Sequence, residues 1–350
     1  MKSKRWFCTE NLMALIFWVA TFIYPFTTSG YKVDNFTYYF IMIVFMLSLY
    51  LLWGYTGIFS FGQAAFFGIG AYVYGIFSKA SPKSTGMGLL GIVLGCVIPM
   101  ILALILGIFI YYGHINASFI GIITFCLSLT LQTFMTQTSG PEWQILGVKL
   151  GGFNGLNKIP AIHFGGFQIK GMTMYFVSFA IALGAYILFR VIQRSNFGYM
   201  MLSIRENPER SELFGYDTAK ISTIVFAIGG GIAGFAGVLF ASWGAYVVPA
   251  TLSTSTSFIA VIIIALAGRY SVTGATIFTF FYVWFTRAMA AAGSEYSQVL
   301  QGLLLVVIIL FIPRGIGETI FSFGDSLLKK LTPKKSSKVR VAKKLSQGKG

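Results

Sequence analysis

Long apolar stretches that contain no charged residue dominate this chain. A helix that crosses a bilayer needs about 20 consecutive apolar residues, and a charge at the bilayer centre costs at least about 2.5 kcal/mol. Spans must therefore lie between the charges. Three of the charge-free intervals are long enough for two spans each, dividing at 53–57, 113–114 and Pro249. The pattern predicts an all-α integral membrane fold with about ten transmembrane helices. The intervals are 11–31, 35–78, 84–141, 171–189, 221–268, 270–286 and 296–313.

Composition and charge agree with this interpretation. Only 10% of the 350 residues are charged, against roughly 25% in an ordinary soluble domain, which excludes a soluble protein. If ten spans alternate, 19 of the 26 Lys and Arg residues fall on the side of both termini. The positive-inside rule then predicts that both termini are cytoplasmic. We interpret the first interval as a span and not as a cleaved signal peptide, since no A-x-A-like site follows it.

The predicted organisation is one transmembrane domain with a basic tail. The domain covers residues 1–326, with a cytoplasmic loop at 193–218 and an external loop at 140–171. Nine of the basic residues lie between Lys329 and Lys349 with no acidic residue among them. We expect residues 327–350 to be disordered and to lie along the anionic cytoplasmic leaflet. The net charge of +16 is therefore attributed to membrane topology and not to binding of nucleic acid.

The sequence contains none of the common catalytic or metal-binding motifs. There is no G-x-x-x-x-G-K-[ST] phosphate loop and no G-x-S-x-G elbow. His114 and His163 have no metal-ligand partner at helical spacing, and the three cysteines show no C-x-x-C spacing. Because all ten acidic residues lie in predicted loops or at span ends, ion-coupled transport is also disfavoured. We expect no enzyme and no cofactor, with any ATP hydrolysis on another chain.

The cytoplasmic loop contains the pattern of a complete short helix. Asn207 is a good N-cap, Pro208 suits the first helical position, and Gly215 is a natural residue just after the helix. A second helix is predicted to begin at Asp217 or Thr218. The short helix is either a docking element for a partner or a solvated connector, and pattern alone leaves both open. The candidate docking residues are Arg205, Glu206, Asn207, Pro208, Glu209, Glu212, Leu213, Phe214 and Gly215.

The other candidate site lies where the interval 35–78 is interrupted. Glycines at Gly57 and Gly62 allow a broken helix, which is tolerated at membrane depth against protein or a water-filled cavity. Ser60 and Gln63 would then face a path for a small solute. Alternatively, the glycines serve helix packing and Gln63 makes an interhelical hydrogen bond. A similar spacing of Gly268, Ser271 and Gly274 hints at an internal repeat.

Four segments carry a resemblance to a known family. Residues 203–216, SIRENPERSELFGY, resemble the cytoplasmic loop of the branched-chain amino acid ABC transporter permeases of the LivM type. Residues 54–72, 151–160 and 226–237 resemble further parts of the same family, so that the resemblance extends from about Gly54 to Pro313. The chain departs from the family's usual Gly-Gly-x-Gly-[ST] turn at 267–271, where it reads AGRYS.

The resemblance implies the architecture and partners of an ABC importer permease. It implies a second homologous permease subunit, two cytoplasmic ATPases and an external solute-binding protein, in the cytoplasmic membrane of a bacterium or archaeon. The short helix at 208–214 would be the coupling helix that sits in a cleft of the ATPase. The implied cargo is a branched-chain or other aliphatic amino acid. Urea or a short amide remains an alternative cargo, and an ATP-independent facilitator or a secondary transporter remains an alternative class.

Overall fold

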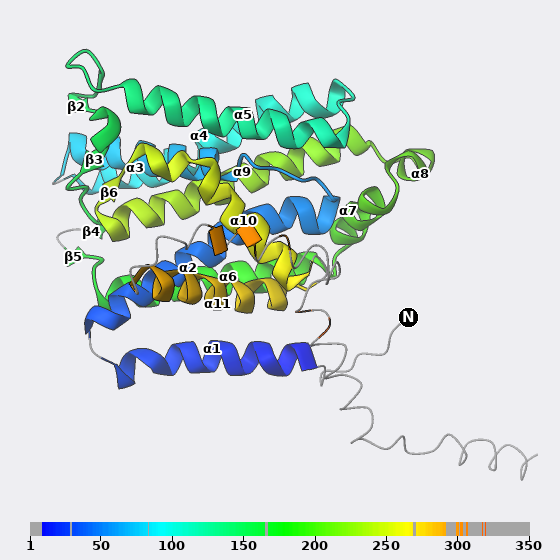
Figure 1. Ribbon diagram of the computed structural model, residues 1–350, viewed down its shortest axis with the longest axis horizontal. Helices are drawn as coiled ribbons and strands as arrows, with labels where there is room; N and C mark the ends of the chain where they lie inside the picture. Colours follow the sequence, from blue (N-terminus) through cyan, green and yellow to red (C-terminus); the bar gives the residue numbers. More distant parts are fainter. Residues whose placement is uncertain are drawn as a thin grey trace, which may run out of the picture.

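The computed structural model describes residues 9–28, 30–82, 84–164, 167–268 and 271–291, together with 299, 300, 302, 303, 306, 317 and 319. These residues form a bundle of roughly antiparallel helices (Figure 1). The basic tail predicted at 327–350 lies outside the described residues, as does most of the predicted span 296–313.

The described part of the chain contains nine long helices, and each overlaps one of the first nine predicted spans, although several extend past the charge-free intervals. They are α1 (Thr9–Thr27), α2 (Gly30–Tyr50), α3 (Gln63–Ala80), α4 (Thr85–Tyr112), α5 (Ala117–Gln137), α6 (Met172–Ile192), α9 (Thr218–Gly244), α10 (Thr254–Ala267) and α11 (Val272–Ala291). Six of them are long and apolar enough to cross a membrane: α1, α2 with its extension to Thr56, α4, α5, α6 and α9. The total of ten spans stays a prediction.

Helices α2 and α9 form the centre of the bundle. Of the residues in their most apolar windows, 83% and 78% are buried, against 22% for α4. Helix α9 packs against α3 and α4, and α2 packs against α6, α9 and α11. The glycines of α9 allow these close approaches: a Cβ at Gly234 would lie 2.5 Å from the carbonyl oxygen of Gly95. Small residues at helix contacts are typical of membrane bundles.

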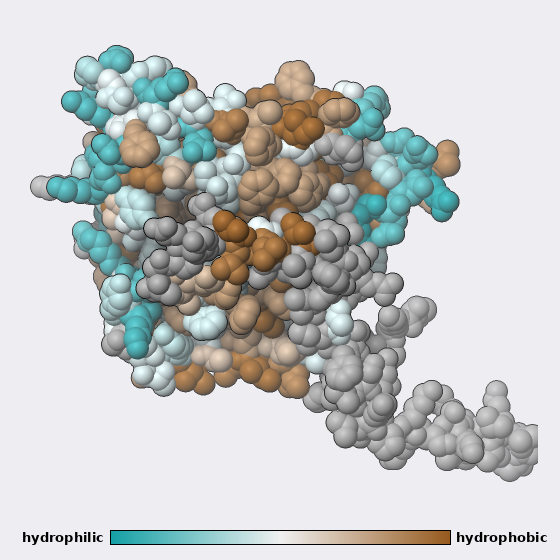
Figure 2. Space-filling view, in the orientation of Figure 1, coloured by the Kyte–Doolittle hydropathy of each residue, from teal (hydrophilic) through white to brown (hydrophobic). Residues whose placement is uncertain are grey.

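The surface of the bundle is polar at two opposite ends and apolar between them (Figure 2). The apolar belt includes the outward face of α4, where Leu90, Val93 and Phe109 are 50%, 56% and 71% exposed. Water would penalise such a surface, whereas lipid tails would not. The distribution is that of a multi-pass membrane protein. We call the end that carries the strands the loop end, and the opposite end, at the right of Figure 1, the α8 end.

Strands occur in the described residues only as three short antiparallel pairs. β1 (Gln144–Ile145) pairs with β2 (Val148–Lys149), and β4 (His163–Phe164) pairs with β5 (Phe167–Gln168). β3 (Leu156–Asn157) pairs with β6 (Tyr246–Val247), with Leu156 opposite Val247. This last pair fixes the predicted external loop to the segment that follows α9. Two 3₁₀ turns, Gly152–Asn154 and Pro249–Leu252, complete the loop end.

Two short helices, α7 (Asn196–Glu206) and α8 (Pro208–Leu213), lie at the α8 end. The predicted short helix is confirmed as α8, and the predicted start of the following helix is confirmed at Thr218, with Asp217 as its N-cap. Helix α7 was not predicted. Its 11 residues follow the end of α6 after only three residues, and Ser195 caps its start.

Candidate coupling helix, helix break and cavities

Helix α8 is capped as its sequence predicts. The side-chain oxygen of Asn207 accepts a 2.9 Å hydrogen bond from the backbone N–H of Arg210, and Pro208 occupies the first helical position. Gly215 follows the helix with φ +86°, a conformation that favours glycine. The caps satisfy backbone groups that would otherwise face water, so that a six-residue helix is held in one shape.

The tip of α8 exposes two large apolar side chains. Leu213 is 88% exposed and Phe214 is 80% exposed, and Figure 1 shows α8 projecting from the bundle. Glu209 is exposed on the same helix. Glu212, in contrast, accepts a hydrogen bond from the hydroxyl of Thr218 at the start of α9, and the hydroxyls of Ser203 and Ser211 join α7 to α8 at 2.8 Å. α8 is thus anchored at its base and free at its tip.

Arg205, on α7, connects the predicted cytoplasmic loop at 193–218 to the break in α2. Helix α2 continues from Leu51 to Thr56 as a π-helix and ends at Gly57, whose φ is +76°. Nη1 of Arg205 donates a 2.6 Å hydrogen bond to the carbonyl oxygen of Gly54, and Nη2 pairs with Glu206 at 2.8 Å. A Cβ at Gly57 would lie 2.8 Å from Cγ of Arg205. The two groups of candidate residues are therefore in direct contact through Arg205 and Gly57.

The segment 57–62 between the break and α3 is held by polar groups of a neighbouring helix. The backbone N–H of Phe61 donates to Oγ1 of Thr124 at 3.0 Å, and the hydroxyl of Ser128 donates to the carbonyl of Phe61 at 3.2 Å. Both partners lie on α5. Ser60 is fully buried and its Oγ accepts from the backbone N–H of Gly62 at 3.1 Å. An irregular backbone at this depth is thus satisfied by protein.

Gln63, the first residue of α3, is fully buried and only half satisfied. Its Oε1 accepts a 3.1 Å hydrogen bond from the hydroxyl of Ser48 on α2, which also donates to the carbonyl of Phe45 at 2.5 Å. Its Nε2 has no hydrogen-bond partner among the described residues. The interhelical hydrogen bond is present, and the amide nitrogen remains available to another acceptor.

The start of α3 meets the start of α10 inside the bundle. The backbone N–H of Ala64 donates to Oγ of Ser257 at 3.0 Å, and the rings of Phe61 and Phe258 lie 5.0 Å apart. Helix α10 has only 14 residues, about 21 Å at 1.5 Å per residue, which is less than the roughly 30 Å hydrocarbon core. Both helices therefore begin within the bundle, with the positive ends of their dipoles close together.

The two segments suspected of being a repeat have a similar local structure. Gly57 and Gly268 both have positive φ, +76° and +85°. Each is followed by a serine whose Oγ accepts from a glycine N–H: Ser60 from Gly62, and Ser271 from Gly274 at 2.9 Å. Arg269 and Tyr270 lie outside the described residues, so the departure from the family's turn is not seen.

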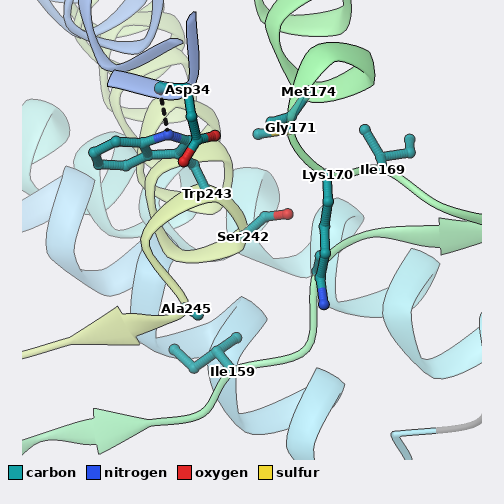
Figure 3. A pocket seen from close by; sticks show the side chains of 10 residues that line it. Asp34, Ile159, Ile169, Lys170, Gly171, Met174, Ser242, Trp243 and Ala245 are labelled. Atoms are coloured by element: carbon teal, nitrogen blue, oxygen red, sulfur yellow. Dashed lines mark hydrogen bonds between the residues drawn. The ribbon is translucent and has the colours of Figure 1, made fainter. Parts of the chain in front are cut away.

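Two cavities open toward the loop end, and neither is lined by Ser60, Gln63, Gly57 or Gly62. The first, of about 180 Å³, contains Asp34 and Lys170 on opposite walls, with Trp243 beneath (Figure 3). Nε1 of Trp243 donates to the carbonyl of Asp34 at 2.9 Å. The proposed path residues are closed off from both cavities in this conformation.

The second cavity, of about 260 Å³, shares Trp243 with the first and contains Arg287. Counting charges assigned Arg287 to a loop, but the structure places it inside α11 (Val272–Ala291). The missed signal was its position between apolar runs on both sides. No group of three His, Cys, Asp or Glu side chains that could hold a metal ion occurs among the described residues.

Comparison with known proteins shows which family the chain resembles and over which residues. The sequence profile of the family described as "Branched-chain amino acid transport system / permease component" matches residues 12–309. The chain belongs to this permease family. The matched residues include the break at Gly57, the predicted cytoplasmic loop at 193–218 and Arg287, and they end before the basic tail.

Named relatives are similar over most of their length at low identity. The chain is 23% identical to the high-affinity branched-chain amino acid transport system permease protein LivM of Salmonella typhimurium, over 87% of this chain and 74% of the relative. It is 24% identical to the probable LivM of Methanocaldococcus jannaschii, over 77% of this chain and 88% of the relative. No solved structure matches. The permease relatives are transport proteins, which agrees with the absence of catalytic motifs in this sequence.

Proposed function

We propose that this chain is the membrane-spanning permease subunit of an ATP-binding-cassette importer for branched-chain or other aliphatic amino acids. It works with a second homologous permease subunit, two cytoplasmic ATPases and an external solute-binding protein, in a bacterial or archaeal cytoplasmic membrane. Family membership supports the cargo class. The observation that carries the coupling role is the exposed apolar tip of the capped helix α8.

Helix α8 has the features that a docking element requires. An interface gains most of its energy from a few apolar or aromatic anchors that become fully desolvated. Leu213 and Phe214 are such anchors, and Glu209 and Arg210 beside them provide polar contacts at the rim. While they face water, the two large apolar side chains at the end of α8 contribute no burial free energy. Burial in a cleft of an ATPase explains them.

Movement of α8 would reach the substrate path through Arg205. The chain of contacts leads from α8 through the Ser203–Ser211 hydrogen bond to α7, and from Arg205 to the carbonyl of Gly54. From there the π-helical turn continues through Gly57 and Gly62 to Gln63. We propose that closure of the ATPases tilts this segment and opens a path past Ser60 and Gln63 to alternate sides of the membrane. In this proposal, the hydrogen bonds of the segment to α5 and α10 belong to one of the two states and would change in the other.

The docking claim is tested by co-purification of this chain with tagged ATPase subunits. Leu213→Ser combined with Phe214→Ser removes the anchors but leaves the Asn207 cap intact. We expect the variant to insert normally but to lose ATPase association and uptake of labelled L-leucine. Glu209→Lys combined with Glu212→Lys gives a second variant, in which the Glu212 contact with Thr218 is lost as well.

The matched control is Phe153→Ser, which removes an aromatic side chain that is 78% exposed at the opposite, loop end. It should leave ATPase association unchanged. Full association and full uptake in the Leu213/Phe214 double variant would contradict the docking claim. Uptake of L-leucine by liposomes that contain only this chain would instead indicate a facilitator, and dependence on an ion gradient without ATP would indicate a secondary transporter.

A further inference from the structure

Among the described residues, Arg287 is the only charged side chain that lines the larger cavity, which lies between α2, α9, β6, α10 and α11. The rest of the wall is mostly apolar or aromatic, and includes Met42 and Val283, which are 2% and 3% exposed, and Trp243. A guanidinium among aromatic side chains in a membrane helix is costly and marks a functional site by default.

The guanidinium is held in place, and no acidic side chain among the described residues forms a salt bridge with it. Its Nη1 donates to the backbone oxygen of Asn35 at 3.4 Å and to Oδ1 of the same residue at 3.2 Å. Its Cζ lies 4.3 Å from the centre of the Tyr38 ring and 5.8 Å from that of Trp243. Two salt bridges join described residues, Arg190 with Glu10 and Arg205 with Glu206, and neither includes Arg287. Of the five N–H donors of the guanidinium, only those on Nη1 have hydrogen-bond partners within the part of the chain that the structure describes.

Such an arrangement suits a carboxylate attached to an aliphatic group. A guanidinium presents a planar fork that binds a carboxylate through two parallel hydrogen bonds. Met42, Ile259 and Val283 on the same cavity wall offer an apolar surface to a branched side chain. A volume of about 260 Å³ is below the roughly 300 to 1,000 Å³ of sites for drug-sized ligands, and so fits a small solute.

We propose that this cavity binds the cargo amino acid on its way through the permease, with Arg287 holding its α-carboxylate and the apolar wall holding its side chain. This inference rests on the proposed function, since it takes an aliphatic amino acid as the cargo. It adds a binding site at the loop end, separate from Ser60 and Gln63. The neighbouring cavity, which shares Trp243, leads toward Lys170 on the exposed segment after β5 (Figure 3).

The phosphate of an anionic lipid is another oxyanion that the guanidinium of Arg287 could bind in the same way as a carboxylate. The cavity walls come from five elements and include the centrally buried α2 and α9, which favours a small solute over a headgroup at the surface. The experiment therefore separates the two sources by choosing the lipid around the protein.

The test labels a cysteine inside the cavity. Cys8, Cys96 and Cys126 are replaced by alanine, and Thr286, which lines the cavity beside Arg287, is replaced by cysteine. The complete importer is placed in nanodiscs of phosphatidylcholine, and the rate of labelling by a small maleimide is followed against the concentration of L-leucine or of L-leucinamide, which lacks the carboxylate. Uptake of L-leucine is measured in parallel with the same complex in closed liposomes of phosphatidylcholine.

We expect L-leucine to slow the labelling of Thr286→Cys and L-leucinamide to have at least about tenfold less effect, since a charge-assisted hydrogen bond is lost. Adding Arg287→Gln should abolish that difference, whereas Lys149→Gln, which removes a charge at the same end but outside both cavities, should leave it intact. Arg287→Lys should retain part of the protection. This last comparison separates charge from a merely structural loss.

Two results would overturn the inference: equal protection by both compounds, or protection only when phosphatidylglycerol replaces phosphatidylcholine. Uptake of L-leucine without protection of the cysteine would refute this site and leave the proposed function intact. Protection without any uptake of branched-chain amino acids would refute the proposed function and leave the carboxylate site standing.

Discussion

Arg205 donates a 2.6 Å hydrogen bond from Nη1 to the backbone carbonyl oxygen of Gly54, 151 residues earlier in the chain. The acceptor lies in the π-helical turn Leu51–Thr56 that ends α2, and turns of this kind are found mostly as bulges in α-helices, frequently at functional sites. The donor lies on α7, next to the helix that we propose to contact the ATPase. This bond therefore joins the loop that we predict to be cytoplasmic to the broken helix α2.

Replacing Arg205 by Gln should separate ATP hydrolysis from transport. The variant loses a hydrogen bond to a charged donor, which typically contributes about 1.5 to 3 kcal/mol, but keeps α8 and its exposed anchors. We expect normal assembly with the ATPases and a several-fold fall in L-leucine transported per ATP hydrolysed. Arg194→Gln removes an exposed arginine of the same loop and serves as the control. An unchanged ratio in the Arg205 variant would show that force does not pass through this contact.

Gly57→Ala tests the same junction from the other side. At φ +76° an alanine costs about 1 to 2 kcal/mol, and its Cβ would lie 2.8 Å from Cγ of Arg205. Gly147 has the same φ of +76° with nothing within 4 Å of its Cβ position, so Gly147→Ala carries the backbone cost alone. Thermal unfolding in detergent should show a small loss for both variants. Only Gly57→Ala should also lower transport per ATP, and equal behaviour of the two would argue against the contact.

The order of helices along the chain could be predicted from charge spacing because charges are excluded from the bilayer centre wherever a span lies. The α8 helix could be predicted from Asn207, Pro208 and Gly215 because capping is local in sequence. The contact between Arg205 and Gly54 could not, because it depends on how distant segments pack. The rule that charges lie outside spans also assigned Arg287 to a loop, whereas the helix continues past this residue and packs it against Tyr38.

The packing of α3 against α9 should tolerate no side chain at Gly70. A Cβ there would lie 2.1 Å from the carbonyl oxygen of Gly234, and neither backbone has room to move. We expect Gly70→Ala to lower the free energy of unfolding by about 1 to 3 kcal/mol, or to prevent folding, as overpacking does. Gly184→Ala on α6, where nothing lies within 4 Å, should instead be neutral or stabilising by about 0.5 to 1 kcal/mol. Unfolding midpoints in one detergent compare the pair.

Gln63→Met distinguishes the two roles that the sequence leaves open for this residue. If Gln63 only joins helices, methionine removes the bond from Ser48 and both stability and transport fall together. We expect a different outcome, because Nε2 is buried without a partner in the described structure, and a buried unsatisfied donor costs about 1 to 3 kcal/mol. Methionine of similar shape removes that cost, while Ser48 keeps its bond to Phe45. The midpoint of unfolding should therefore stay level or rise while uptake of L-leucine falls.

Ser48→Ala, which removes the same interhelical bond and leaves the amide in place, is the control and should retain uptake. A variant that loses stability and uptake in proportion would remove Gln63 from the path.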